Sequence, residues 1–290
     1  MKLIYAGLTF LMFISCKKEV KITSEGFEFE VIKEGTGPTP EPNDFVRYNF
    51  RVLNNEREII QDFVQEDYPQ VYSVKDSLNT KIISKAIKEI LSTSKKGGNY
   101  LLKIPSDSLS ETQAEKKSNN FLFYEVEVKE IFNKVQYYDF KKEVEFKRNA
   151  KIENLQEETK NVMQDFYSGK NNFKEISSGL KVKYLEEGNG PDLKIGDTYK
   201  IHYLGFLKDG KKIGDSYKIS SGLINILGSG QIIDGWNLAF QNFRKGTKAY
   251  LFVPSNLAYG DQGNLPEVPG NSDLFFYIEI IDVRPGTHTE

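Results

Sequence analysis

Residues that usually carry out chemistry are scarce in this sequence. The 290 residues include one cysteine and two histidines, so neither an internal disulfide nor a cluster of His and Cys metal ligands can form. Aromatic residues set among aliphatic ones stand out in the last third: Tyr203, Trp236, Tyr259 and Phe276. Taken singly, such residues are more often part of an ordinary core. Together they could line a dry pocket that binds a substrate and stabilises its transition state.

These aromatic residues belong to short blocks that follow one another in a fixed order. The blocks are 200–205, 209–212, 227–236, 243–246, 253–260, 268–269 and 274–280. Their order and spacing resemble the FKBP-type peptidyl-prolyl cis-trans isomerase family across residues 179–283. The resemblance implies a curved antiparallel sheet half wrapped around one short helix. The strands would lie near 181–187, 198–207, 248–254 and 274–283, and the helix at 235–243.

The resemblance also assigns roles. Rotation about an X-Pro bond is slow because amide resonance gives a barrier of about 18–20 kcal/mol, and a dry aromatic pocket can favour the twisted, less polar amide. The family pattern implies that Trp236 forms the floor under the prolyl ring, that Tyr259 hydrogen-bonds the substrate, and that the backbone N–H of Ile233 receives a substrate carbonyl. The implied walls are Tyr203, Phe276, Ile232 and Ile233, and the implied substrate-binding residues are Ile213, Leu223, Ile232 and Val268. No cofactor is implied.

Some positions depart from the family pattern. Its Phe-Asp pair appears here as Ile213-Gly214-Asp215, so either the pocket has lost its aspartate or a one-residue shift lets Asp215 serve as a catalytic residue. Leu223 stands where the family often has Phe, and Asn264 falls near a frequent His. His202 alternates with Tyr203 along a strand, so it should face away from the pocket.

The first half of the chain repeats the pattern of the second. Residues 26–38 echo 179–191, and the correspondence continues through the later strands. This copy has Ala86 where the other has Trp236, and no Ala-Tyr-Gly block follows Pro105. We expect a degenerate FKBP-like domain at 17–133 that keeps the fold without the pocket, as a partner-binding module or an inherited spacer. The fold class is therefore α+β, with two FKBP-like domains.

A helical linker is expected at 134–172. Residues 135–166 contain no Gly or Pro, and apolar residues recur at helical spacing, which predicts one long helix or two. The polar turn at 148–151 interrupts this stripe, which favours covering one domain's flank over a coiled coil. A homodimer through the helix stays open. The isomerase domain would then occupy 173–290.

The N-terminus predicts export. Residues 1–16 combine a basic residue, an apolar run too short to span a bilayer comfortably, and a small residue before the only cysteine. They resemble a lipoprotein signal peptide with residues 13–16 as the lipobox, a lipid attached to Cys16, and the body outside the cytoplasm, in the periplasm. A lipobox ahead of an isomerase domain also resembles the gliding-motility-associated isomerase lipoproteins of the Bacteroidetes.

Charge and motif together define the expected function. The 39 basic and 41 acidic residues leave a net charge of -2, which gives no reason to expect a nucleic-acid partner. The sequence predicts a prolyl isomerase that acts on proline-containing polypeptide clients and assists the folding of exported proteins at a membrane. The alternative is a non-catalytic chaperone or assembly factor that binds proline-containing segments.

Overall fold

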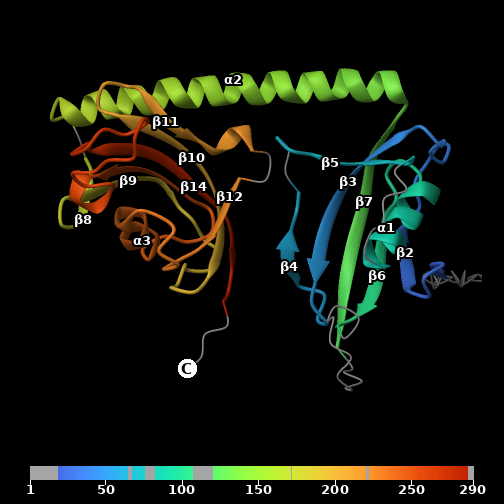
Figure 1. Ribbon diagram of the computed structural model, residues 1–290. Helices are drawn as coiled ribbons and strands as arrows, with labels where there is room; N and C mark the ends of the chain where they lie inside the picture. Colours follow the sequence, from blue (N-terminus) through green and yellow to red (C-terminus); the bar gives the residue numbers. More distant parts are fainter. Residues whose placement is uncertain are drawn as a thin grey trace, which may run out of the picture. The chain divides into compact units, whose positions relative to one another are not determined.

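A computed structural model of the chain describes residues 19–64, 67–75, 82–106, 120–170, 172–219 and 222–286. The chain divides into two compact units, Met1–Phe146 and Lys147–Glu290. Each unit has its own antiparallel sheet and its own hydrophobic core (Figure 1). The units are described separately below.

The first unit is a seven-stranded sheet with one helix of its own. The strand order is β1-β2-β6-β7-β3-β4, and β5 pairs with β3. The strands are β1 (Glu19–Ile22), β2 (Glu28–Lys33), β3 (Phe45–Leu53), β4 (Ile59–Asp62), β5 (Gln70–Ser73), β6 (Asn99–Pro105) and β7 (Phe121–Phe132). Helix α1 (Ile82–Thr93) buries Ala86, Ile90 and Leu91 in the core of this sheet. This amphipathic face explains why the short helix is stable there.

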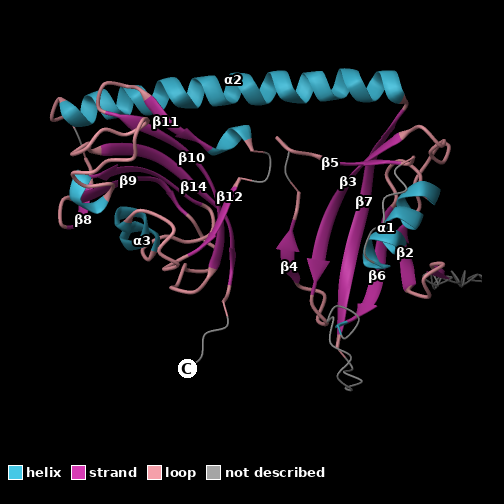
Figure 2. Cartoon of the chain, viewed as in Figure 1, coloured by secondary structure: helices cyan, strands magenta, loops and turns pink. Residues whose placement is uncertain are grey.

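The second unit repeats the same topology. Its strand order is β8-β9-β13-β14-β10-β11, and β12 pairs with β10. The strands are β8 (Lys174–Ser177), β9 (Leu180–Glu187), β10 (Thr198–Leu207), β11 (Lys212–Asp215), β12 (Leu223–Ile226), β13 (Thr247–Val253) and β14 (Leu274–Arg284). The curved sheet wraps around helix α3 (Asp234–Phe240) (Figure 2). Short 3-10 turns occupy η2 (Ser216–Lys218) and η3 (Ser255–Leu257).

The repeat extends to local detail. The pairing of β3 with β7 shifts register between Arg47 and Tyr48, and the pairing of β10 with β14 shifts between Lys200 and Ile201. Each of these strands is preceded by an aspartate whose carboxylate accepts a backbone N–H three residues earlier: Asp44 from Glu41, and Asp197 from Lys194. Equal bulges and equal turns at equal positions confirm two copies of one fold.

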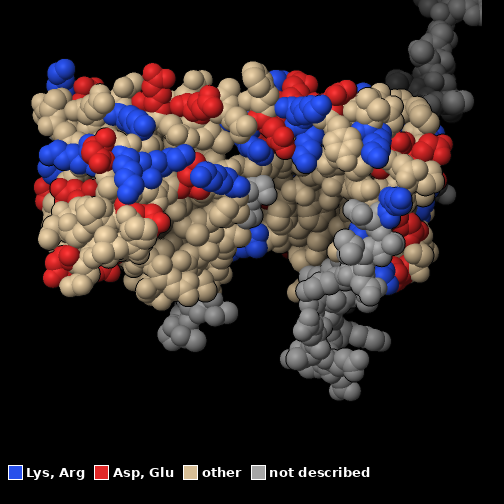
Figure 3. Space-filling model, turned by 45° about the horizontal axis from the view of Figure 1, so that its top comes forward, with Lys and Arg blue, Asp and Glu red and all other residues tan. Residues whose placement is uncertain are grey.

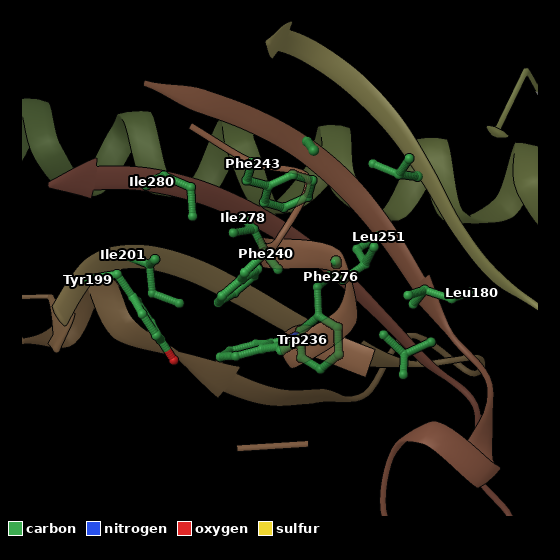
Figure 4. Packing of buried hydrophobic residues seen from close by; sticks show 14 of the residues in the cluster. Leu180, Tyr199, Ile201, Trp236, Phe240, Phe243, Leu251, Phe276, Ile278 and Ile280 are labelled. Atoms are coloured by element: carbon green, nitrogen blue, oxygen red, sulfur yellow. The ribbon is translucent and has the colours of Figure 1, made fainter. Parts of the chain in front are cut away.

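The core of the second unit surrounds α3 on the concave face of the sheet. Tyr199, Phe240, Leu251 and Ile278 are fully buried there, with Trp236 and Phe276 at one end of the cluster (Figure 4). Gly235 allows the helix to approach β13 closely, because a Cβ at that position would collide with Cγ1 of Val253. The helix is therefore pressed onto the sheet, which fixes the position of Trp236, the next residue.

Helix α2 is continuous over Lys134–Tyr167. Its first turns belong to the first unit, where Tyr137 stacks on Phe45 at 3.9 Å and Phe140 stacks on Phe132 at 4.8 Å between ring centroids. Its later turns belong to the second unit, where Met163 is buried with β10, β13 and β14. Of the two alternatives, one long helix or two, the structure has one, because residues 148–151 interrupt the apolar stripe without interrupting the helix.

The convex face of the second sheet carries a small aromatic core against α2. Phe166 lies 4.7 Å from Phe252 and 4.8 Å from Phe173, and Tyr250 donates a hydrogen bond to Glu158 at 3.1 Å. The apolar residues of α2 therefore pack against the first unit at one end of the helix and against the second unit at the other. The expectation that they cover the flank of a single domain was wrong.

The predicted fold class is confirmed: two antiparallel FKBP-like sheets with a helical linker. The four strands expected in the second unit match β9, β10, β13 and β14 to within one residue at each end, and the expected helix ends earlier, at Phe240. Among the described residues, no helix has the length and apolar character needed to cross a membrane. Basic and acidic side chains are interspersed on the face shown in Figure 3.

Candidate active site in the C-terminal unit

A cavity of about 280 Å³ opens between α3 and the strands β10, β11, β12 and β14 of the second unit. Nine of the residues expected in the site line it: Tyr203, Ile213, Leu223, Ile232, Ile233, Trp236, Tyr259, Val268 and Phe276. Gly214, Gln231, Asn264 and Glu267 complete the lining. Strands far apart in sequence therefore bring the aromatic and aliphatic residues of the motif to one place.

The aromatic side chains of the cavity support one another edge to face. Trp236 lies 5.0 Å from Tyr203, with ring planes at 77°, and 5.1 Å from Phe276, with planes at 72°. Tyr203 and Phe276 lie 6.3 Å apart. Such pairs add about 0.5–1.5 kcal/mol each beyond the area they bury. Trp236 is 5% exposed and Phe276 is 4% exposed, so both side chains are almost fully buried where they line the cavity.

A glycine in β10 makes room for one of these rings. A Cβ at Gly205 would lie 2.7 Å from Cε1 of Phe276. Gly205 pairs directly with Phe276, and directly opposed residues of antiparallel strands share a face of the sheet. Glycine at this position thus lets the Phe276 ring lie flat across β10 and close the wall of the cavity.

A backbone donor lies at the start of α3. The N–H of Ile233 donates to no acceptor among the described residues, whereas its carbonyl accepts from the N–H of Trp236 at 3.0 Å. Ile233 has extended backbone angles and precedes the first helical residue. Ile233 is one of the residues that line the cavity. The indole Nε1 of Trp236 also has no hydrogen-bond partner in the described part of the chain.

Asp215 lies outside the lining, contrary to its expected role. Its carboxylate accepts the backbone N–H of Tyr217 at 3.0 Å and pairs with Lys212 at 2.7 Å, so it caps η2. Its two predecessors in β11, Ile213 and Gly214, both line the cavity. The pairing of β10 with β11 shifts register between Gly205 and Phe206, yet Asp215 is still not among the lining residues. The wall beside Tyr203 has a glycine where the family pattern has an aspartate.

Tyr203 fills the space that Gly214 leaves open. A Cβ at Gly214 would lie 2.6 Å from Cε2 and 3.1 Å from the hydroxyl of Tyr203. Burial raises the pKa of the Tyr203 phenol, and Tyr259 and Asp215 raise it further. The hydroxyl is therefore protonated at neutral pH, and it is directed toward the side of the cavity where Gly214 lies.

His202 faces away from the cavity, as alternation predicts. Its ring stacks on Tyr217 at 4.5 Å, and its Nδ1 lies 3.3 Å from Oγ of Ser216. Ser216 accepts the backbone N–H of Tyr203 at 2.7 Å. His202 and Ser216 hold the strand behind the pocket wall and do not line the cavity.

The polar part of the lining lies at the rim. Tyr259 is 39% exposed, while Asn264 and Glu267 are exposed. Asn264 and Val268 exchange two backbone hydrogen bonds of 2.8 and 2.9 Å, which hold Val268 against the core. Glu267 and Gln231 were not expected in the site. Each directly precedes an expected lining residue, and that adjacency is the only signal of them in the sequence.

The first unit also contains a cavity, and the expectation that it lacks one was wrong. A cavity of about 460 Å³ lies between α1 and the strands β3 and β5. Phe50 occupies the position of Tyr203: it pairs with Val126 as Tyr203 pairs with Ile278, after equivalent bulges. Ala86 is buried in the core and does not line the cavity. Loss of the indole altered this cavity without closing it.

The expected lipidation residue, Cys16, lies outside the described residues. Among those that are described, no group of three or more His, Cys, Asp or Glu side chains could hold a metal ion.

Comparison with known proteins agrees with the architecture of the second unit. Residues 190–281 match the family described as FKBP-type peptidyl-prolyl cis-trans isomerase. The isomerase FkpA of Escherichia coli K12 is 39% identical over 112 residues, which are 39% of this chain and 40% of that protein. A probable FKBP-type isomerase of Haemophilus influenzae is 35% identical over 140 residues, 47% of this chain and 57% of that protein.

The chain thus spans about half the length of these relatives. A crystal structure of a peptidyl-prolyl cis-trans isomerase from Pseudomonas syringae shares 31% identity with a TM-score of 0.38, over 44% of this chain and 96% of that one. The family match falls on the residues that build the cavity, from Gly190 to Ile281. Through its C-terminal unit, the chain belongs to the FKBP-type peptidyl-prolyl cis-trans isomerase family.

Proposed function

We propose that the C-terminal unit is a peptidyl-prolyl cis-trans isomerase that binds a prolyl ring in the cavity and accelerates rotation of the preceding peptide bond. The supporting observation is the combination of a buried aromatic floor and a backbone donor in one wall: Trp236 with Phe276, and the N–H of Ile233. The cavity volume of about 280 Å³ suits a small apolar group. The family match and both bacterial relatives support the same activity.

The mechanism requires no nucleophile. The planar amide is stabilised by resonance and by polar surroundings, while the twisted amide is less polar. Surrounding the bond with the rings of Tyr203, Trp236 and Phe276 removes water and favours the twisted form. The N–H of Ile233 would hold a substrate carbonyl, and Tyr259 would contribute from the rim. Each 1.4 kcal/mol of such preference gives a tenfold rate increase.

We propose that the clients are proline-containing segments of exported polypeptides. In this proposal Cys16 carries a lipid, and the chain is held at a membrane with its body in the periplasm. The support is the short apolar segment before the single cysteine.

A non-catalytic chaperone is the second candidate, and one observation favours it. Gly214 lines the wall beside Tyr203 where the family pattern has an aspartate, and the Asp215 carboxylate lies outside the lining. A cavity that binds proline without promoting rotation would still hold unfolded segments. The two candidates differ in whether they raise the rate of prolyl isomerisation, which can be measured directly.

The test is the refolding of a protein limited by one prolyl isomerisation, with the 290-residue chain and its Trp236→Ala variant. We expect the wild-type chain to accelerate refolding at substoichiometric concentration. The acceleration by Trp236→Ala should be at least tenfold smaller. Absence of acceleration by the wild type, with binding of the refolding protein retained, would reject the enzyme and favour the chaperone.

A further inference from the structure

The cavity of the first unit is a built site rather than a packing defect. Its lining includes four aromatic residues, Tyr48, Phe50, Phe63 and Tyr72, with Ile87 and Leu91 contributed by α1. Phe50 packs at 5.4 Å from Phe63 and at 5.8 Å from Tyr124, so its ring is held in place from two sides. At about 460 Å³, the cavity is larger than the one in the second unit.

The two cavities are bounded by equivalent elements. The first lies between α1 and the strands β3 and β5, and the second lies beside α3, β10 and β12, which occupy the same places in the repeated topology. The lining differs in kind: Trp236 has no counterpart, since Ala86 is buried beneath the cavity in the core. A wider cavity with a ring-lined wall suits a larger apolar group than a prolyl ring.

Polar groups occupy part of the lining. Its polar members are Gln70, Ser84 and Lys88, together with the phenols of Tyr48 and Tyr72. Burial raises the pKa of Tyr48, so that phenol is protonated at neutral pH. Lys88 lies 5.8 Å from the ring centre of Tyr72, at the rim. This combination of aromatic rings with a few polar groups suits the binding of an apolar group.

We propose that this cavity binds unfolded polypeptide segments by taking in one bulky apolar side chain, phenylalanine or leucine, without a preference for proline. The aromatic wall would contact the side chain, and the polar rim would contact the peptide backbone on either side of it. The inference relies on the proposed isomerase function only in taking the partner to be an unfolded polypeptide. Aromatic anchors in desolvated pockets are the usual source of affinity in such contacts.

The test uses fluorescence anisotropy with labelled twelve-residue Gly-Ser peptides that carry a central Phe-Leu, Ala-Pro or Ala-Ala pair. The 290-residue chain should bind the Phe-Leu peptide at least tenfold more tightly than the Ala-Ala peptide. Ser84→Phe places a ring in the cavity from α1 and should weaken binding of the Phe-Leu peptide at least tenfold. Thr93→Phe adds the same ring at an exposed position of α1 that does not line the cavity, and should leave binding unchanged.

A second variant tests whether misfolding of Ser84→Phe, rather than filling of the cavity, causes the loss of binding. Val71→Asp introduces a carboxylate into the lining from β5, which pairs with β3 alone among the described strands. Val71→Asp should weaken binding of the Phe-Leu peptide as Ser84→Phe does. Its circular dichroism spectrum and melting temperature should stay near those of the wild type. Equal affinity of the wild type for all three peptides, or equal binding by folded Ser84→Phe and Thr93→Phe, would overturn the proposal.

Two further measurements separate the explanations. Ser84→Phe should retain the refolding activity of the wild type, so failure of this inference and failure of the isomerase proposal are distinguishable. Laurate serves as the probe for a small lipid-like ligand. Laurate binding that Ser84→Phe abolishes, with no peptide binding in the wild type, would reject the polypeptide partner and identify a lipid-chain site.

Discussion

The ring of Tyr203 meets the indole of Trp236 edge to face, with centroids 5.0 Å apart and planes at 77°. The two residues come from β10 and α3, so this contact joins the sheet to the helix within the lining of the cavity. Removing either ring would open the dry part of the site to water.

Replacing Tyr203 by leucine should lower kcat/KM for prolyl isomerisation at least tenfold, because both edge-to-face contacts of the Tyr203 ring disappear. Tyr203→Phe keeps those contacts and should stay within about threefold of the wild type, since each 1.4 kcal/mol corresponds to tenfold. The measurement is proline-limited refolding over a range of substrate concentrations. An equal loss in both variants would show that the hydroxyl, and not the ring, matters.

Replacing Gly214 by alanine should displace the Tyr203 ring, because the new Cβ would lie 2.6 Å from Cε2 of that ring. We expect a severalfold loss of kcat/KM and a changed tryptophan emission spectrum. The chain has one tryptophan, Trp236, so the emission reports this cavity alone. Ile224→Ala, at a 57% exposed position of β12, is the control and should change neither quantity. Unchanged activity in Gly214→Ala would show that the Tyr203 ring has room to move.

The site was predictable where it depends on ordered motifs. The blocks around Tyr203, Trp236 and Phe276 are specific in type and spacing, and antiparallel pairing brings them together wherever that fold forms. The role of Asp215 could not be read in the same way. Whether a residue faces the pocket depends on strand register, and a single position moves a side chain to the other face.

The cavity of the first unit was missed for a related reason. Its sequence lacks the tryptophan and the Ala-Tyr-Gly block, and the absence of a motif was taken as absence of a cavity. The cavity depends instead on the separation of α1 from β3 and β5, which aromatic packing around Phe50 maintains. The sequence left one helix or two open for α2, since the residues at 148–151 interrupt the apolar stripe but not the helix.

Each half of α2 should stabilise its own unit. Phe166 packs on Phe173, Phe252 and Phe275, so Phe166→Ala should lower the free energy of unfolding of the second unit by about 3 kcal/mol. Phe140→Ala removes the stacking on Phe132 in the first unit. Denaturant unfolding followed by Trp236 emission should shift its midpoint for Phe166→Ala and not for Phe140→Ala. A shift in both would mean that the units unfold together.

The lipid anchor predicted at Cys16 is tested by its removal. Replacing the only cysteine by serine removes the sulfur that would carry the lipid. In cells that process bacterial lipoproteins, the wild-type chain should incorporate radiolabelled palmitate and fractionate with membranes. Cys16→Ser should do neither, and its isomerase activity in solution should be unchanged. Membrane fractionation of Cys16→Ser equal to that of the wild type would reject the anchor.

Alkaline pH should destabilise the second unit through its buried phenols. Burial, with a further contribution from Asp273, raises the pKa of Tyr167 to about 12, from an ordinary value near 10.0. Burial also raises the pKa values of Tyr199, Tyr217, Tyr250 and Tyr277. In the unfolded chain these phenols lose their protons first, so the folded state binds more protons above pH 10. The stability is complete below about pH 10 and is lost as pH rises toward 12.

Tyr167→Phe separates one contribution from the others. The Tyr167 hydroxyl is buried without a hydrogen-bond partner in the described part of the chain, so removing it should be neutral or slightly stabilising at pH 7. Between pH 10 and 11 the variant cannot ionise at this position, and its free energy of unfolding should fall less steeply with pH than that of the wild type. Urea unfolding followed by Trp236 emission at several pH values measures both slopes. Parallel slopes would show that Tyr167 ionises equally easily in the folded and unfolded chains, and that its burial does not hinder loss of the proton.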